Sequence, residues 1–253
     1  MKIFAIGDLH LSFTGPVDPG QWDRVREHKS MGALFPVWQG HYRKLYEEWN
    51  AAVGREDTVL VPGDISWGMR LEDARPDLDF LGLLPGRLIL IQGNHDYWWQ
   101  SISRVRRTVP PNVQVIQNDH VLIGDVAVCG TRGWTCPSDT HDKEEDRRIY
   151  QRELLRLEMS LKSVPPGTAR KIIVLMHYMP TNEKHERSGF IDILISYGVS
   201  MVVYGHLHAA AKNHRLPDRA WGISFHLVSA DYLDFRPLCL DQLEGDGSVC
   251  GSP

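Results

Sequence analysis

Residues 87–96 read Arg-Leu-Ile-Leu-Ile-Gln-Gly-Asn-His-Asp, a mostly apolar run that turns polar at a glycine. The first five residues predict a buried strand, and Gly93 predicts a tight turn after it. Asn94, His95 and Asp96 therefore bring an amide, an imidazole and a carboxylate to the carboxyl end of a strand. In open α/β sheets, ligands bind at that edge. The stretch thus predicts both a core strand and part of a site.

Apolar runs followed by polar side chains recur at four more places in the chain. The predicted strands are residues 2–6, 58–61, 172–176 and 201–204. The polar side chains that follow them are Asp8 and His10, Asp64, His177, and His206 and His208. Any one of these patterns is explained by an ordinary turn or a core histidine. Because all five strands carry such side chains at the same end, we interpret them as one site.

The rest of the chain mixes helices and strands. Apolar spacing predicts helices over 41–53, 71–84, 142–162 and 191–197, and residues 97–102 indicate the start of another. Further short strands are predicted over 113–116, 121–123, 126–129, 224–228 and 233–240, with a hairpin turn at residues 124–125. Because no repeat or linker divides the chain, we predict one domain over residues 1–240 and a loose tail over 241–253.

Residues 12–40 carry many glycines and prolines, interleaved with Phe13, Trp22, Phe35 and Trp38. An aromatic-bearing loop of this length inside a compact domain is usually functional. We interpret residues 12–53, the loop and the helix after it, as a lid-like insertion. The alternative is a loop whose aromatic side chains pack on the body of the domain.

The composition of the 253 residues is that of an ordinary globular protein, with 42% hydrophobic and 24% charged residues. The formal net charge of -4 offers no argument for binding nucleic acid or an anionic membrane. Arg104, Arg106 and Arg107 form a small basic cluster, which is either a solvated helix face or a phosphate-binding patch. Oligomeric state is not predicted.

The cysteines and the N-terminal residues indicate in which cellular compartment the protein is expected. None of the four cysteines forms a Cys-x-x-Cys pair, so free thiols in a reducing compartment are the simplest interpretation. The chain begins with an apolar strand that is too short for a signal peptide. No run approaches the length of a membrane span. We therefore expect a cytoplasmic protein.

The clustered ligand types indicate metal chemistry. Asp8 and His10 are two residues apart, so on extended backbone both would point the same way and reach one ion. Carboxylate, amide oxygen and imidazole, without thiolate, suit Mn, Fe or Zn rather than a structural zinc site. The donors are too many for one ion. Two ions about 3.5–4 Å apart, sharing a carboxylate, would use them and would turn a bridging water into a hydroxide.

The order Asp-x-His, Gly-Asp, Gly-Asn-His-Asp, His, Gly-His-x-His resembles that of the calcineurin-like metallophosphoesterases, over residues 3–208. The resemblance implies an α+β fold, an αββα sandwich in which two mixed β-sheets pack face to face and are flanked by helices. It also implies an enzyme that hydrolyses phosphoesters at two divalent metal ions, with Mn, Fe or Zn as candidates.

The resemblance assigns a role to each residue of the cluster. It implies a first metal bound by Asp8, His10 and His208, a second bound by Asn94, His177 and His206, and a bridge formed by Asp64. His95 would bind no metal but would stabilise the developing charge and protonate the leaving oxygen. Asp96 would hold the His95 ring and raise its proton affinity. The bridging hydroxide would attack phosphorus without a covalent intermediate.

Departures from branches of the family narrow the substrate. Asp64 is followed by Ile-Ser-Trp-Gly and His95 by Asp96, which disfavours a protein Ser/Thr phosphatase. Trp67 stands where purple acid phosphatases carry a tyrosine ligand, and His95 stands where lipid-sugar pyrophosphatases of the family carry arginine. What remains is a compact, bacterial-type phosphohydrolase, and we favour a small phosphodiester as the substrate. The alternatives are a phosphomonoesterase or nucleotide pyrophosphatase and, without catalysis, a metal-held scaffold that binds a phosphorylated partner.

Residues 130–134 follow another predicted strand and carry Arg132 and Trp134 beside glycines. Such a strand end can contact the phosphate and a ring of a small phosphorylated substrate. It can equally be a loop with a packed Trp134. Arg132 is the cation that we expect to bind substrate.

Overall fold

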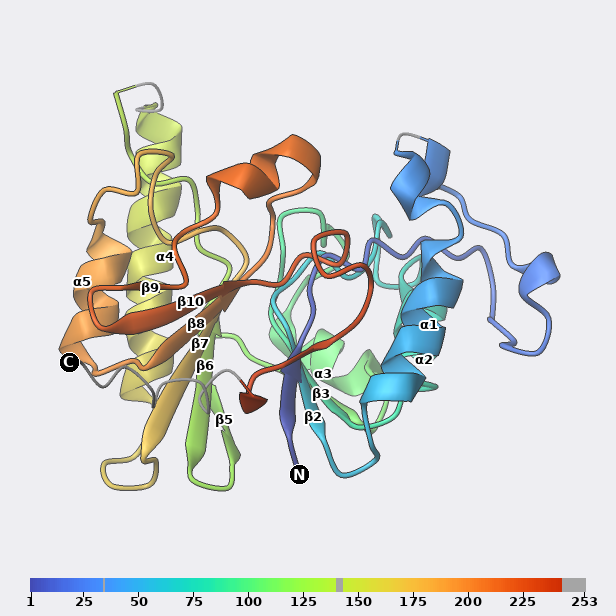
Figure 1. Ribbon diagram of the computed structural model, residues 1–253, viewed down its shortest axis with the longest axis horizontal. Coiled ribbons are helices and arrows are strands. Elements are labelled where there is room, and N and C mark those ends of the chain that lie inside the picture. The colour runs from blue at the N-terminus through green and yellow to red at the C-terminus, as the bar shows by residue number, and fades with distance from the viewer. Residues whose placement is uncertain (34, 140–142, 243–253) are drawn as a thin grey trace, which may run out of the picture.

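The computed structural model describes residues 1–33, 35–139 and 143–242, and its core is a pair of β-sheets (Figure 1). Within these residues the first sheet has five strands, in the order β11 (Leu238–Cys239), β1 (Ile3–Ala5), β2 (Thr58–Val61), β3 (Arg87–Leu90) and β4 (Val113–Val115). The second has six, in the order β5 (His120–Ile123), β6 (Val126–Thr131), β7 (Lys171–Met176), β8 (Met201–Tyr204), β10 (Ile223–Leu227) and β9 (Arg219–Ala220).

Both sheets are mixed: the first is antiparallel only at its β11 edge, and the second is antiparallel at both edges. Strands β1 to β4 run parallel to one another, and so do β6, β7, β8 and β10. Strands β11, β5 and β9 join antiparallel. Because neighbouring parallel strands end at the same edge, the segments that follow β1, β2 and β3 emerge together, as do those that follow β7 and β8.

Successive side chains of a strand point to opposite faces of its sheet, so each sheet contributes to two separate cores. In β1, Ile3 and Ala5 belong to a core that also contains Ile173 and Leu175 of β7, so this core lies between the two sheets. Phe4 points the other way, into the core beneath the helices. The inter-sheet contact explains why most inner positions of the central strands are apolar.

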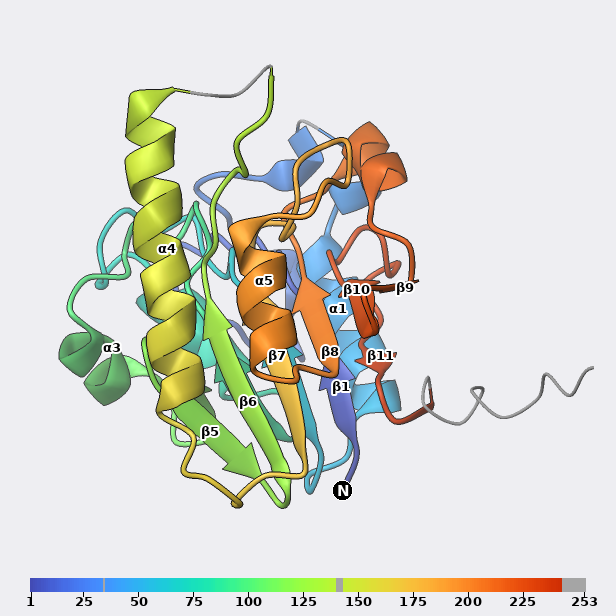
Figure 2. The same cartoon turned by 90° about the vertical axis from the view of Figure 1, so that its left-hand side faces the viewer.

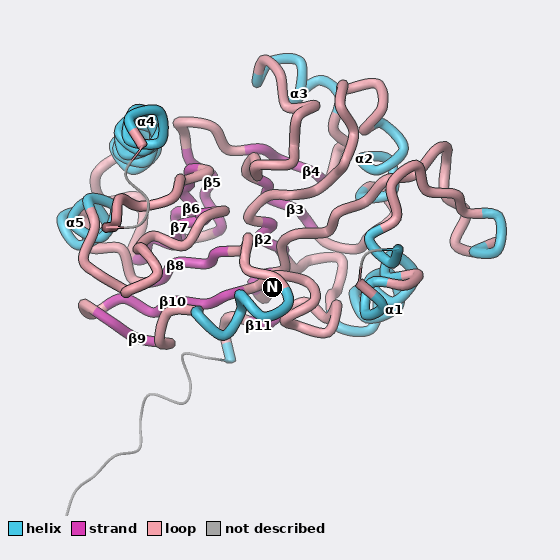
Figure 3. The backbone as a smooth tube through the Cα atoms, turned by 90° about the horizontal axis from the view of Figure 1, so that it is seen from above, coloured by secondary structure: helices cyan, strands magenta, loops and turns pink. Residues whose placement is uncertain are grey.

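Helices cover both outer faces. Helices α1 (His41–Ala52), α2 (Arg75–Leu81) and α3 (Ile102–Thr108) cover the first sheet, while α4 (Glu144–Lys162) and α5 (Gly189–Ser196) cover the second (Figures 1 and 2). Figure 3 shows the helices outside the two sheets from above. The predicted αββα sandwich is therefore confirmed. Among the described residues, no helix combines the length and the apolar character needed to cross a membrane.

Several element boundaries differ from those predicted. The helix predicted over 71–84 is helical only from Arg75, because Pro76 occupies its first turn, and it ends at Leu81. The strand predicted over 233–240 is paired only at β11, since Asp234 and Phe235 have left-handed φ angles of 52° and 64°. The buried Phe235 ring packs against Trp38, which turns the chain away from the sheet. Strand β9 and the 3-10 helix Ala209–His214 were not predicted.

Other predictions agree with the fold, and one concerns residues that the structure does not describe. The hairpin at residues 124–125 joins β5 to β6. Cys129, Cys136 and Cys239 are free in the described part of the chain, as expected. The described residues of the region 12–40 include three short 3-10 helices, Trp22–Arg24, Met31–Ala33 and Pro36–Trp38. Of the predicted tail, residues 243–253 lie outside the described residues.

Candidate metal centre

The polar side chains that follow five strands meet where the two sheets end together. The first sheet contributes Asp8 and His10 after β1, Asp64 after β2, and Asn94 after β3; the second contributes His177 after β7, and His206 and His208 after β8. The main chain joins the two sheets at the same place, because Gly7 donates from N–H to the carbonyl of Val228, just beyond β10, at 2.7 Å. The site is thus shared by both sheets.

Two glycines allow the strand ends to approach one another. A Cβ atom on Gly93 would lie 2.1 Å from Asp64 Oδ1, and one on Gly205 would lie 2.3 Å from Asp8 Oδ2. Both distances are far inside van der Waals contact, so only glycine fits at these positions. The glycines of the Gly-Asn-His-Asp and Gly-His-x-His motifs therefore serve the close packing of the carboxylates.

The backbone at the site is unusual. Asp8, His10, Asp64 and His206 have left-handed φ angles of 57°, 46°, 52° and 71°. A left-handed conformation costs a residue with a Cβ about 1–2 kcal/mol, and such residues cluster at functional sites. The expectation that Asp8 and His10 lie on extended backbone is wrong. Their side chains meet because the chain turns at both residues, with the fully buried Leu9 between them.

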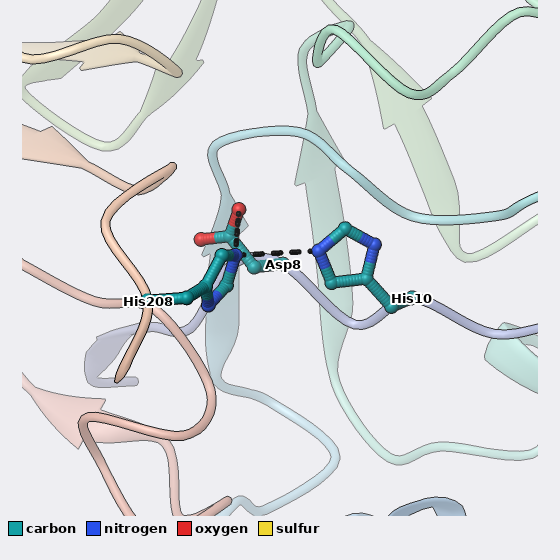
Figure 4. Close-up of side chains that lie close together, drawn as sticks. All are labelled: Asp8, His10 and His208. Carbon is teal, nitrogen blue, oxygen red and sulfur yellow. Dashed lines mark hydrogen bonds and ion pairs between the residues drawn. The ribbon is translucent and has the colours of Figure 1, made fainter. Parts of the chain in front are cut away.

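One group of candidate ligands is formed by Asp8, His10 and His208 (Figure 4). His208 Nε2 lies 3.3 Å from His10 Nε2 and 3.4 Å from Asp8 Oδ1. Two imidazole nitrogens and a carboxylate oxygen facing one point form a donor set that suits a divalent transition metal.

A second group lies beside the first. Asp8, Asp64 and His177 bring ligand atoms within 4.8 Å of one another. Asn94 Oδ1 lies 2.6 Å from His177 Nε2 and 2.9 Å from His206 Nδ1. The first sheet and the second sheet therefore both contribute to this group.

Asp64 stands between the two groups. Its Oδ2 atom lies 3.7 Å from His10 Nε2, in the first group, and 3.5 Å from His177 Nε2, in the second. Its other oxygen, Oδ1, accepts a hydrogen bond from the backbone N–H of His95 at 2.8 Å. One carboxylate oxygen is thus held by the backbone while the other faces both sets of imidazole nitrogens.

Hydrogen bonds on the far side of two rings decide which nitrogen can bind a metal. His177 Nδ1 lies 3.0 Å from the carbonyl oxygen of Pro62, which can only accept, so Nδ1 carries the proton and Nε2 is free as a ligand. His208 Nδ1 lies 2.8 Å from Asp231 Oδ1, and the backbone N–H of Ala209 donates to Asp231 Oδ2. Carboxylate and carbonyl partners of this kind orient metal-binding histidines.

Asp231 was not among the predicted site residues. It follows strand β10, whose carboxyl end lies beside that of β1 through the parallel bridge between Gly7 and Ser229. A carboxylate just after a predicted strand is the same signal that marked Asp8 and Asp64. The pattern Ser-Ala-Asp after residues 224–228 therefore held the information that would have found it.

The electrostatics of the site match a bound cation. Burial, together with the charge of Asp8, raises the pKa of Asp64 to about 8. Burial would also raise the pKa of Asp8, but the charge of His208 lowers it well below its usual value. Burial lowers the pKa of His208, but the neighbouring carboxylates of Asp8 and Asp231 outweigh it and raise the pKa of His208 to about 10. Buried carboxylates that share one imidazolium in this way, next to convergent neutral nitrogens, fit positively charged metal ions.

His95 lies next to the ligands without belonging to either group. Its ring centroid is 4.3 Å from that of Trp67 and 5.7 Å from that of His10. Burial, followed by the charges of His177 and Lys29, lowers the pKa of His95 to about 4. Among the described residues, its buried Nδ1 atom has no hydrogen-bond partner.

The role expected for Asp96 is corrected by its contacts. Its Oδ2 atom accepts a hydrogen bond from the N–H of Gly93 at 2.7 Å. Its Oδ1 atom accepts from the N–H groups of Ile65 and Ser66 and from Nε1 of Trp98, at 2.9, 3.1 and 2.9 Å. None of these contacts involves His95, whose buried Nδ1 atom has no hydrogen-bond partner among the described residues, so Asp96 does not hold the His95 ring. It fixes instead the turns that present Asp64 and Asn94.

Arg132 and Trp134 lie on the side of the site formed by the second sheet. Arg132 is held near Glu153, with 3.8 Å between its Nη2 atom and Oε1, and its guanidinium carbon lies 4.8 Å from the centroid of the Trp134 ring. Trp134 Nε1 donates to Asp146 at 2.9 Å. The Trp134 ring contacts the ring of Tyr178, which in turn lies 4.1 Å from the ring of His206. Contact of Arg132 and Trp134 with substrate stays a prediction.

The 12–40 region packs against the first ligand group. The Trp38 ring, which is 1% exposed, lies 5.6 Å from the rings of both His10 and His208. Just beyond this region, His41 Nε2 lies 3.0 Å from the carbonyl oxygen of Leu9, between the candidate ligands Asp8 and His10. Trp38 therefore agrees with the alternative interpretation of residues 12–40, in which the aromatic side chains of the loop pack on the body of the domain.

Comparisons with known proteins agree with this architecture. The sequence pattern of the calcineurin-like phosphoesterase family matches residues 1–210. The fold is similar to that of the phosphopantetheinyl hydrolase PptH from Mycobacterium tuberculosis, with a TM-score of 0.53 and 14% identity over 99% of this chain and 98% of that one. It is also similar to AQ665 from Aquifex aeolicus, a protein of unknown function, with a TM-score of 0.51 and 15% identity over 96% of this chain and 98% of that one. At these identities the likeness establishes the fold alone.

A closer match in sequence covers a short segment. Over 64 residues the chain is 48% identical to the Gene 66 protein of Mycobacterium phage D29. The match spans 23% of this chain and 30% of the phage protein, which is less than a third of that relative's length.

Proposed function

The chain belongs to the calcineurin-like phosphoesterase family, and from this premise we propose that it hydrolyses a small phosphodiester at two divalent metal ions. The observation that carries the proposal is the position of Asp64, whose Oδ2 atom faces His10 Nε2 at 3.7 Å and His177 Nε2 at 3.5 Å. A carboxylate oxygen between two sets of imidazole donors is the arrangement that a pair of ions sharing one ligand requires.

The ligand groups described above divide between the two ions. The first ion would be held by Asp8, His10 and His208, the second by Asn94, His177 and His206, with Asp64 common to both. When bound, such ions supply a nucleophile from water near neutral pH and neutralise charge on the phosphoryl oxygens. Nitrogen and oxygen donors without thiolate favour Mn, Fe or Zn.

His95 is the residue that we assign to the leaving group. Its ring lies beside the first ligand group, and its Nδ1 atom has no partner within the described residues. An imidazole that ligates no metal is free to stabilise charge on the leaving oxygen and, in its protonated form, to give it a proton. This arrangement supports an enzyme over a scaffold that only binds a phosphorylated partner, since a scaffold needs no acid. Hydrolysis of a phosphomonoester or of a nucleotide pyrophosphate is the alternative at the same site.

The test is turnover of chromogenic esters by metal-loaded protein. With Mn, Fe or Zn bound, the protein should hydrolyse bis-p-nitrophenyl phosphate faster than p-nitrophenyl phosphate, and metal-free protein should hydrolyse neither. Faster hydrolysis of the monoester would contradict the proposed diester substrate and favour a phosphomonoesterase instead. No turnover of either ester with any of these metals would contradict the enzyme.

A variant of His95 separates catalysis from metal binding. His95→Ala should lower kcat about 10²–10⁴-fold, the usual contribution of a general acid, while its metal content stays that of the wild type. His120→Ala is the matched control, because His120 lies on β5 and contacts Ser163. Loss of metal from His95→Ala would make His95 a ligand and refute its assigned role.

A further inference from the structure

Lys29 places a cation without an acidic partner beside the metal centre. Its Nζ atom lies 3.1 Å from the centroid of the Trp67 ring. Within the described residues Lys29 forms no ion pair, whereas Lys44, Lys162 and Lys184 each pair with an Asp or Glu. The side chain is exposed, so its charge is available to a molecule in solution.

The main chain of Lys29 is anchored to the segment that carries the first ligands. The buried hydroxyl of Ser12 donates to the carbonyl oxygen of Lys29 at 2.6 Å, and the N–H of His28 donates to the carbonyl oxygen of Ser12 at 2.9 Å. Ser12 comes two residues after His10. The position of Lys29 is therefore fixed relative to the ligand His10.

Trp67 connects Lys29 with the reacting end of the site. Its ring lies 4.3 Å from that of His95 and stacks on that of His10 at 4.9 Å, with 19° between the planes. Trp67 itself follows the shared ligand Asp64 by three residues. The ammonium group thus stands over a ring that contacts the residue assigned to the leaving group.

The charge of Lys29 can bind a part of the substrate that the metal ions do not contact. In the proposed function, on which this inference rests, the metal ions neutralise the reacting phosphoryl group and His95 faces the leaving oxygen. We propose that Lys29 is a specificity-determining residue, which binds a second anionic group carried by the leaving group of the substrate. A hydrogen bond between an ammonium and an anion is among the stronger polar contacts, so the preference for charged leaving groups should be large.

A pair of esters that differ only in leaving-group charge tests the proposal. Methyl 4-nitrophenyl phosphate releases a phenolate with no further charge, and methyl 3-carboxy-4-nitrophenyl phosphate releases one that carries a carboxylate. For the holoenzyme, Lys29→Gln should lower kcat/KM for the carboxylated ester about tenfold, and change kcat/KM for the other ester less than twofold. Lys29→Arg should keep the preference of the wild type.

The control variant is Lys162→Ala, which removes an exposed lysine from the end of α4, where it pairs with Glu158. It should leave both esters unaffected, and thermal melting checks that each variant is folded. Equal losses on both esters, or no loss on either, would overturn the role of Lys29 while leaving the proposed function intact. Failure of the wild-type holoenzyme to hydrolyse either ester would instead overturn the proposed function, and this inference with it.

Discussion

Single hydrogen bonds decide which atoms of this site can bind a metal. The carbonyl oxygen of Pro62 and the carboxylate of Asp231 each accept a hydrogen bond from Nδ1 of a histidine, so that Nε2 of His177 and of His208 faces the site. Burial alone would lower the pKa of His208. Its contacts with Asp8 and Asp231 outweigh burial and raise this pKa to about 10. This pKa favours a protonated His208 at neutral pH in the metal-free protein, and a metal ion bound at Nε2 would have to displace that proton.

Replacing Asp231 tests this orienting contact. Asp231→Asn should weaken metal binding about 10–100-fold, the usual cost of losing such a partner, because the amide no longer favours the proton on Nδ1 of His208. Titration of the metal-free protein with Mn or Zn measures the change. Asp234→Asn is the control, since Asp234 forms an ion pair with Lys44 at the surface and asparagine tolerates its left-handed φ of 52°. Equal metal affinity of the two variants would contradict the role of Asp231.

Asp96 offers a second test at the same scale. In Asp96→Asn, one of the oxygens that accept from backbone and Trp98 donors becomes an NH₂ group, which cannot accept a hydrogen bond. The free energy of unfolding should fall by about 1–3 kcal/mol, the cost of a buried group left unsatisfied. Urea unfolding measures this loss, and His95→Ala serves for comparison. Unchanged stability with an altered pH profile of turnover would restore the orienting role that the contacts exclude.

At the scale of elements, Asp77 ties helix α2 to the two turns that carry the site. Its Oδ1 atom accepts from the N–H of Phe13 at 2.7 Å, and its Oδ2 atom is bonded to the hydroxyl of Ser66. Phe13 lies three residues after His10, and Ser66 lies two after Asp64. Burial raises the pKa of Asp77 to about 7 from a usual value of 3.8. The helix therefore holds both turns through a carboxyl group that is protonated below pH 7.

The raised pKa of Asp77 predicts a dependence of stability on pH. The protonated form stabilises the fold fully below pH 3.8, and this contribution is lost as pH rises through about 7. From this group, the wild type should lose up to about 1.4 kcal/mol of unfolding free energy per pH unit between these values.

In Asp77→Asn that loss should be absent, because the amide can accept from Phe13 and donate to Ser66 at every pH. Urea unfolding of both metal-free proteins from pH 4 to 8 measures the two slopes. The other buried groups titrate in both proteins, so the difference between the slopes isolates Asp77. Identical slopes would show that Asp77 is ionised throughout.

At the scale of the whole molecule, the candidate ligands join the two sheets. Asp8, His10, Asp64 and Asn94 follow strands of the first sheet, while His177, His206 and His208 follow strands of the second. A core of apolar side chains from both sheets fills the space between them. Metal ions bound here would cross-link the two halves of the sandwich at one end.

Removal of metal should therefore lower stability. A ligand that binds only the folded state at 100 times its Kd stabilises by about 2.7 kcal/mol, which corresponds to roughly 5–10 °C in Tm for a chain of this size. Melting of metal-loaded and chelator-treated protein measures the shift. His208→Ala, which lacks one ligand, should show a smaller shift. Equal Tm values with and without metal would refute the cross-link.

The sequence by itself determined the architecture and the list of candidate ligands. An apolar run with polar side chains just beyond it is a local pattern, and parallel pairing is enough to bring such strand ends to one edge. The central strands and the convergence of Asp8, His10, Asp64, Asn94, His177, His206 and His208 followed from it. The resemblance to a family added the αββα layers and the expected division of roles among these residues.

Only the tertiary structure decided what each polar group contacts. Asp231 meets His208 across 23 positions, Trp67 rather than a carboxylate lies against His95, and Asp96 bonds to backbone N–H groups instead of the neighbouring ring. Left-handed turns at Asp8 and His10 replaced the extended backbone that their spacing indicated. The physical reason is that a hydrogen-bond partner is chosen by packing between segments far apart in the chain, whereas a strand and its end are encoded by neighbouring residues.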